Sequence, residues 1–273
     1  MPRSTRSEPN AWPRAPTHEE WLRLSPAERE RVVAELPDEV TDAELSPPEG
    51  DLHFWGKVSA LDTLRNHFRR KGKAVYLASE LPVYYPGEAR FAPDLLAVVG
   101  AEDKERGKWV VDHEGQGLHV VMEVHVGGDR KKDAVDNVER YARLGVPEYF
   151  IFDRNIPALL AYRLSESGKK YVPIVPQHGR YRCEQLALDL QLEHGKLRFY
   201  DGNALLLETS ELAQRLEQMV DDLQQRLEDE TRRREDETRR REDETRRRED
   251  ETRRREAADR RVAELEAELR NKK

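Results

Sequence analysis

Only one cysteine, Cys183, occurs in the chain, so an internal disulfide is excluded. No apolar run approaches the ~18 residues that a membrane-spanning helix needs, and the N-terminal residues lack the apolar segment of a secretion signal. We therefore expect a soluble, cytoplasmic protein under reducing conditions, with no membrane partner. The net charge of −7 argues against a protein that coats nucleic acid through bulk electrostatics. Any contact with DNA should come from a local basic patch or a metal-screened site.

Charged residues make up 38% of the 273 residues, and much of this excess lies in one C-terminal segment. Near the N-terminus, Thr17 with Glu20 and Ser25 with Glu28 each have the spacing of a capping box, which predicts two short helices. We expect three parts: an N-terminal extension with short helices (1–44), one domain (45–207) and a long helical tail (208–273).

Apolar patterning predicts that the middle part is an α/β domain. The expected elements are a helix over 51–71, strands near 74–79, 93–99 and 118–124, a helix over 130–144, a strand over 149–152, and further β-structure over 158–200, with alternation over 182–190 and a turn at His194-Gly195. The strands 118–124 and 149–152 and the helix between them form a βαβ unit, whose strands run parallel with a right-handed crossover.

Two acids lie at the ends of two buried strands. Asp94 begins the first strand and Glu123 lies near the end of the second, so antiparallel pairing brings them together at one edge of the sheet. Side chains alternate along a strand, so Glu123 and His125 share one face, while Met122 and Val124 share the other. Two carboxylates that face one cavity suit Mg²⁺ or Mn²⁺.

An acid at the end of a strand is more often a solvated terminus than a metal ligand, so the pair alone is weak support for a metal site. If Asp94 and Glu123 share a cavity without metal, their charges repel each other. On this basis, Asp94→Ala should leave the melting temperature unchanged or raise it.

Three segments are more specific: ProAsp at 93 and 94, GluVal at 123 and 124, and TyrAlaArgLeuGlyValProGluTyrPheIlePheAsp at 141 to 153. Together they resemble the Uma-type family of restriction endonucleases, in the PD-(D/E)XK superfamily. The resemblance covers about 45–210, so the N-terminal helices and the tail lie outside it. It implies an αβββαβ restriction-endonuclease-like core with a mixed sheet, which cuts DNA phosphodiester bonds with Mg²⁺.

The resemblance also implies roles for single residues. Asp94 and Glu123 would be the metal ligands, and the backbone carbonyl of Val124 would be a third. Members of the superfamily use a lysine, placed either two residues after the Glu or in the following helix. Here His125 and Asn137 occupy those two positions.

Three residues could replace this lysine. His125 could bind metal or act as a base, and Lys131 or Lys132 could reach back from the start of the helix. If none of them does, the site is weakened and the domain binds DNA or a protein without cutting. His53, near the start of the first core helix, is either a site residue or a core or capping histidine.

Basic residues cluster at two places that could contact DNA phosphates. The expected contacts are Arg65, Arg69, Arg70, Lys71, Lys131 and Lys132. For either cluster alone, a solvated helix end is the simpler interpretation.

The tail contains GluAspGluThrArgArgArg four times in tandem, from Glu228 to Arg255. Each acid precedes an Arg at the stabilising i,i+4 spacing and no position is apolar, which favours a solvated single helix, acting as a spacer, over a coiled coil. The helix should run from about 209 to 270, a length on the order of 90 Å. Apolar residues with heptad-like spacing flank the repeats and could make a homo-oligomer: Leu212, Leu216, Met219 or Val220, Leu223 and Leu227 before them, and Val262, Leu265 and Leu269 after them.

The leading hypothesis from the sequence is therefore a metal-dependent DNA endonuclease. One alternative is the same fold with a degraded site that binds DNA or a protein. The other is an interaction protein that acts through its helical tail and uses the domain as a scaffold.

Overall fold

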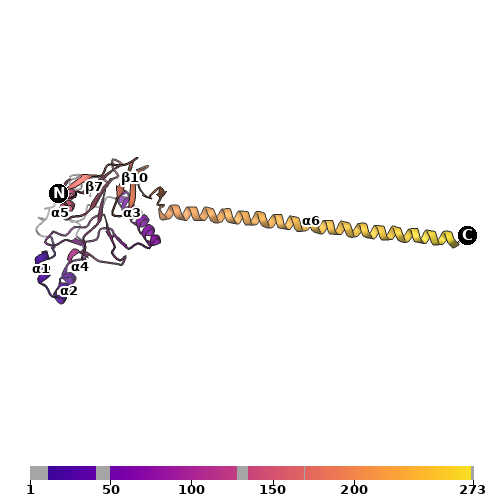
Figure 1. Ribbon diagram of the computed structural model, residues 1–273, viewed down its shortest axis with the longest axis horizontal. Coiled ribbons are helices and arrows are strands. Elements are labelled where there is room, and N and C mark those ends of the chain that lie inside the picture. Colours follow the sequence, from indigo (N-terminus) through magenta and orange to yellow (C-terminus); the bar gives the residue numbers. More distant parts are fainter. Residues whose placement is uncertain (1–11, 41–49, 128–134, 169, 272–273) are drawn as a thin grey trace, which may run out of the picture. The chain divides into compact units, whose positions relative to one another are not determined.

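The structure, a computed structural model, describes residues 12–40, 50–127, 135–168 and 170–271. It contains two compact units, Met1–Thr209 and Ser210–Lys273. The first unit is a mixed α/β domain, and the second belongs to one continuous helix, α6 (Thr209–Asn271), as Figure 1 shows. Among the described residues, no helix is both long enough and apolar enough to cross a membrane.

The domain contains five helices in its described part, and two small sheets beside the main one. The helices are α1 (His18–Arg23), α2 (Pro26–Glu35), α3 (Gly50–Lys71), α4 (Val111–Glu114) and α5 (Asn137–Arg143). The small sheets consist of β2 (Val83–Tyr84) with β4 (Trp109–Val110), and of β9 (Arg180–Cys183), β10 (Leu188–Glu193), β11 (Lys196–Asp201) and β12 (Ala204–Leu205).

The main sheet has six strands in the order β1-β3-β5-β6-β7-β8. These strands are β1 (Val75–Ala78), β3 (Leu95–Val99), β5 (Val120–His125), β6 (Glu148–Asp153), β7 (Ala158–Leu164) and β8 (Tyr171–Pro173). β3 pairs antiparallel with β5, with Leu95 opposite Met122, and β5 pairs parallel with β6. The order α3, β1, β3, β5, α5, β6 confirms the expected αβββαβ core with a mixed sheet.

Different elements cover the two faces of the main sheet. α3 packs on one face through Leu64 and Phe68, together with residues of β9, β10 and β11. α5 lies on the other face, where Tyr141 packs edge-on against Tyr149. Because both faces are covered, β3, β5 and β6 are nearly continuous runs of buried residues.

Both predicted N-terminal capping boxes are present. The hydroxyls of Thr17 and Ser25 each accept from the backbone N–H three residues further on, and the glutamate there accepts in return. α1, α2 and α4 group together in Figure 1, and Leu36, just after α2, packs against Tyr84 and Val110. The N-terminal helices are therefore joined to the domain by a small core of their own.

The region around α5 differs in its bounds from the expected helix over 130–144. α5 begins at Asn137 and is preceded by two residues, 135 and 136, in a π-helical turn. Residues 128–134 lie outside the described part of the chain. The candidates Lys131 and Lys132 fall within this gap, so the structure places neither of them.

The alternating run over 182–190 is broken by a turn between Cys183 and Leu188. The fully buried carboxylate of Glu148 accepts hydrogen bonds from the backbone N–H groups of Glu184 and Gln185, which holds this turn against β6. The acid that anchors the turn is distant in sequence, so periodicity alone does not predict the break. The predicted turn at His194-Gly195 joins β10 to β11, and both residues have positive φ.

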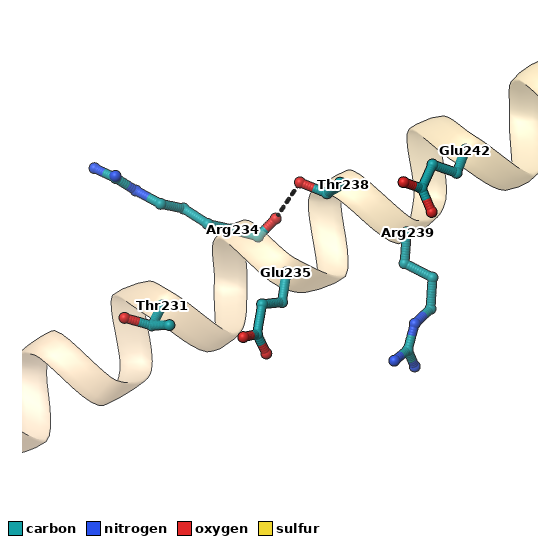
Figure 2. A pocket seen from close by; sticks show the side chains of 6 residues that line it. All are labelled: Thr231, Arg234, Glu235, Thr238, Arg239 and Glu242. Atoms are coloured by element: carbon teal, nitrogen blue, oxygen red, sulfur yellow. Dashed lines mark hydrogen bonds between the residues drawn. The ribbon is translucent and has the colours of Figure 1, made fainter.

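The helix α6 has the predicted extent. In the first three repeats, the last Arg pairs with the Glu four residues before it, as in Arg234 with Glu230 at 2.6 Å. The Thr238 hydroxyl donates to the carbonyl of Arg234 at 2.9 Å (Figure 2). Arg234 projects from one side of the helix, away from Glu235 and Arg239. The side chains beyond Leu265, including that of Leu269, lie outside the described part.

Candidate metal centre

Asp94 and Glu123 meet at one edge of the main sheet, where β3 begins and β5 ends. The backbone N–H of Asp94 donates to Glu123 Oε2 at 3.2 Å. In return, the Val124 N–H donates to Asp94 Oδ2 at 2.7 Å. The antiparallel register of β3 and β5 brings the two acids together, as the sequence predicts.

The helix α3 adds two basic side chains to this edge. His53 Nε2 lies 3.1 Å from Asp94 Oδ2, and Lys57 Nζ lies 4.0 Å from Asp94 Oδ1. The two residues are four apart, so both point to the same side of the helix. Between them, Gly56 lets α3 approach β5: a Cβ at Gly56 would lie 2.8 Å from Val124 Cγ1.

A third acid, Glu80, reaches the same place from the loop after β1. Its carboxylate forms an ion pair with Lys57. The Glu80 N–H donates to the carbonyl of Pro93 at 3.0 Å, and the Ser79 hydroxyl donates to the carbonyl of Asp94 at 2.7 Å. Glu80 also has a φ of 53°, a left-handed conformation that is unusual outside glycine and concentrates at functional sites.

The surroundings of Asp94 favour its charged form. Burial by itself raises the pKa of this carboxyl, but the contacts with His53, the Val124 N–H and the Lys57 charge outweigh burial and hold the pKa below its usual value. Asp94 is therefore a carboxylate at neutral pH and can act as a metal ligand without losing a proton.

Glu123 is held from the opposite side of the sheet by α5. The Tyr141 hydroxyl donates to Glu123 Oε1 at 2.7 Å, and Asn137 Nδ2 lies 3.5 Å from the same oxygen. Burial and the neighbouring Glu123 charge raise the pKa of Tyr141 well above its usual value, so the tyrosine stays a hydrogen-bond donor. Asn137, at a position where the sequence resemblance led us to expect a lysine, thus contacts the candidate ligand directly.

His53, Glu80 and Asp94 form a group that could hold a metal ion, because one ligand atom from each lies within 4.8 Å of the others. The sequence did not predict this group. Asp94 therefore belongs to two possible metal centres: one with Glu123, as predicted, and one with His53 and Glu80. Within the second centre, the Lys57 ammonium already contacts both acids.

His125, which the sequence also predicted as a site residue, is buried at the end of β5, opposite Asp153 of β6. Strand alternation puts it on the same face as Glu123. Its chemical role, like that of the Val124 carbonyl, stays a prediction.

Sequence reasoning missed Lys57, Glu80 and Tyr141. The i,i+4 spacing of His53 and Lys57 in an amphipathic helix was the one available signal, since a lysine is rarely buried without a partner. Glu80 gave no signal, because its place depends on a loop that folds back onto Pro93.

The basic cluster expected to contact DNA divides into two kinds of residue. Arg65 is half-buried and donates to the carbonyl of Leu77 at 3.0 Å, so it has a role within the domain. Lys71 is exposed and pairs with Asp201 at 2.7 Å at the surface. Arg69 and Arg70 are exposed. They lie at the C-terminal end of α3, about 18 Å along the helix from Lys57.

A comparison with protein families gives one match: the family Uma2, described as "Putative restriction endonuclease", over residues 18–195. This is more than half of the chain, and it includes α1 and α2, which the sequence resemblance had left out. A crystal structure from Anabaena variabilis, described as a "putative nuclease belonging to DUF820", is similar with 11% identity and a TM-score of 0.36, over 46% of this chain and 72% of that one. No curated protein matches the chain.

Proposed function

Because the chain belongs to the Uma2 restriction endonuclease family, we propose that it is a metal-dependent endonuclease that hydrolyses phosphodiester bonds in DNA. The observation that supports this most directly is the meeting of Asp94 and Glu123, each of which accepts a backbone N–H from the other's strand segment. Two carboxylates fixed in this way form a site that is organised before any ligand binds.

Mg²⁺ or Mn²⁺ would be held by Asp94 and Glu123, with the Val124 carbonyl as a third oxygen ligand. Such an ion polarises the scissile phosphate and lowers the pKa of an attacking water. The residues fit a hard divalent cation, because all three donors are oxygen atoms and Asp94 is ionised at neutral pH. We prefer this centre to the one with His53 and Glu80, where the Lys57 charge opposes a second cation.

Lys57 supplies the positive charge that is missing at His125 and Asn137, the two positions where we expected a lysine. Its ammonium is buried and held by Glu80, close to Asp94. In this proposal it orients the attacking water and stabilises the charge that develops on the phosphate, which the superfamily lysine does from β5 or the following helix. His53 fixes the orientation of the Asp94 carboxylate, and Tyr141 fixes that of Glu123.

Two exposed aromatic side chains lie at the same end of α3. Phe54 and Trp55 are 52% and 56% exposed, with ring centroids 5.3 Å apart. They directly follow His53 in the helix and precede Lys57. Because exposed aromatic rings stack on unpaired bases, we propose that this end of α3 contacts the DNA strand beside the scissile bond.

The test is a cleavage assay on supercoiled plasmid and on single-stranded DNA, with Mg²⁺, Mn²⁺ or a chelator. Glu123→Gln should abolish cleavage. Glu139→Gln, at an exposed position on α5, makes the same chemical change away from the site and should keep the wild-type rate. Cleavage by the Glu123→Gln protein would show that the chemistry lies elsewhere.

Metal binding separates the two centres that share Asp94. Calorimetric titration with Mn²⁺ should show binding to the wild-type protein and to Glu80→Gln, and little binding to Glu123→Gln. The reverse pattern would assign the ion to His53, Glu80 and Asp94 instead.

A DNA-binding module without cleavage is the second candidate. It is favoured by His125 and Asn137, which replace lysine at both expected positions. DNA binding by the wild-type protein, with no cleavage in either metal, would establish it. Under that outcome Trp55→Ala should still weaken binding, because the aromatic contact does not depend on the chemistry.

A further inference from the structure

The repeat unit of the tail has the length of one heptad, so four tandem copies preserve the heptad phase of the helix. If Leu227 is an a position, Leu223 is at d and Val220 is at a. Five heptads after Leu227, on the far side of the repeats, Val262 is again at a, and Leu265 follows at d. The two apolar flanks therefore lie on one continuous seam of α6.

The apolar members of this seam up to Leu265, where the described side chains end, are exposed on the single helix. Leu223 and Leu227 are 61% and 66% exposed, and Val262 and Leu265 are 55% and 45% exposed. A seam of this kind is the surface that coiled coils bury. It continues through the repeats, where the same positions are charged.

Within the repeats, every d position is Glu and every a position is Arg. The d residues are Glu230, Glu237, Glu244 and Glu251, and the a residues are Arg234, Arg241, Arg248 and Arg255. The charges therefore alternate in sign along the seam. Figure 2 shows the a residue Arg234 on the opposite side of the helix from Glu235 and Arg239, which occupy the outer positions b and f.

We propose that the tail forms an antiparallel two-stranded coiled coil with a second copy of this chain. In antiparallel pairs, a residues face d residues, whereas in parallel pairs a faces a and d faces d. The antiparallel arrangement places Leu223 against Val262 of the second copy, and Arg234 against Glu251. A parallel arrangement would stack Arg on Arg and Glu on Glu through all four repeats, which the partly desolvated seam penalises.

One register satisfies the whole seam. When Arg241 faces Glu244 of the second copy, Glu230 faces Arg255, Leu227 faces Ala258 and Val220 faces Leu265. The apolar flank before the repeats thus meets the apolar flank after them, and each charged layer pairs opposite signs. The repeats then determine orientation and register, while the apolar flanks supply the affinity.

The positions beside the seam are compatible with this arrangement. Position e is Thr in each repeat. Its hydroxyl donates to the carbonyl four residues before it, as for Thr245 with Arg241 at 2.9 Å. The hydroxyl hydrogen therefore already has an acceptor when the position is covered by the second helix. Position g is Arg in each repeat, and antiparallel pairing brings these arginines near each other. Each follows an Asp at the i,i+4 spacing and stays solvated, so this repulsion is weaker than like charges within the seam.

Cysteine cross-linking of the full chain tests the orientation. Glu230→Cys and Arg255→Cys are made in separate chains, one of which carries a fusion that increases its mass. The chains are mixed, oxidised and separated without reductant. The wild-type chain is the matched control, because its one cysteine, Cys183, is buried. Sedimentation of the wild-type protein gives the oligomeric state.

The proposal predicts a dimer by sedimentation, and a disulfide mainly between one chain of each mass. Products that join only chains of equal mass would show a parallel coiled coil, and a monomer at ~100 µM would show no coiled coil; either result overturns the proposal. Leu223→Glu should weaken the dimer at least tenfold. Mixing it with Val262→Lys should restore association, because the two new charges face each other in this register alone.

Discussion

Gly56 of α3 lies so close to Val124 of β5 that a Cβ on the glycine would come within 2.8 Å of Val124 Cγ1. This approach brings His53 and Lys57, on either side of Gly56, to Asp94. A glycine within a helix costs about 1 kcal/mol relative to alanine. Here the close packing offsets that cost.

Gly56→Ala should therefore lower the free energy of unfolding, although alanine favours the helix. The overlap with Val124 costs ~1–3 kcal/mol if α3 has to move, so we expect a net loss of about 1 kcal/mol, measured by urea denaturation. Adding Val124→Ala removes the colliding methyl group. The double variant should be less destabilised than the sum of the two single variants, and simple additivity would contradict the packing argument.

Lys57→Met should reduce the cleavage rate by ~10²-fold or more, because it removes the charge beside Asp94. Lys57→Arg keeps the charge and should retain part of the rate. Mn²⁺ affinity should be unchanged or higher in Lys57→Met, since a competing positive charge is gone. Lys104→Met, in the loop after β3 and so at the opposite end of that strand from Asp94, is the control and should cleave normally. A fall in metal affinity together with the rate would indicate damage to the fold instead.

Asp94→Ala should destabilise the metal-free protein, in contrast to the expectation from the sequence. The change leaves the N–H of Val124 without its acceptor, which costs about 1–3 kcal/mol. Asp94→Asn keeps an acceptor oxygen and should cost less. Thermal unfolding in a chelator measures the stability of both variants. A melting temperature that stays constant or rises in Asp94→Ala would show that repulsion between Asp94 and Glu123 outweighs the lost hydrogen bond.

The lowered pKa of Asp94 also predicts how the difference in unfolding free energy between the wild-type protein and Asp94→Ala depends on pH. A carboxyl whose pKa is lower in the folded state contributes stability above its ordinary pKa of 3.8, and this contribution disappears as the pH falls through the folded value. The gap in unfolding free energy between the wild-type protein and Asp94→Ala should therefore be constant near neutral pH and narrow below about pH 4.

A peptide covering 228–255 should be helical and monomeric. Its acid-to-Arg pairs contribute ~0.3–0.5 kcal/mol each, and it lacks the apolar flanks. Exposed ion pairs are screened by salt, so the helical circular dichroism signal should fall between low and molar ionic strength. A disordered peptide at low salt would contradict the prediction that the repeats are helical without a partner, and so would helicity that appears only on association.

The sequence predicted those parts of the structure that depend on local patterns. The positions of the two strands, with antiparallel pairing as the condition, predicted that Asp94 and Glu123 meet, and the observed register brings them together. Capping boxes gave α1 and α2, and the repeats gave α6. Each of these features depends on residues that are close in sequence or on one pair of strands.

The neighbours of Asp94 could not be predicted in the same way. Lys57 reaches it because α3 packs closely on β5, and Glu80 because a loop in a left-handed conformation is tied to Pro93. The sequence therefore suggested two repelling acids, whereas the structure surrounds Asp94 with basic groups that lower its pKa. Contacts between segments that are distant in sequence therefore decide whether the charge of Asp94 is stabilised or repelled by its surroundings.

The seven-residue repeat of α6 also affects how the gene can change. A whole repeat corresponds to a whole number of codons, so gaining or losing one copy during DNA replication preserves the reading frame. It also lengthens or shortens the helix by ~10 Å and leaves every later residue at the same heptad position. Tail length can therefore vary between lineages in unit steps, while Val262 and Leu265 stay in phase with Leu223 and Leu227.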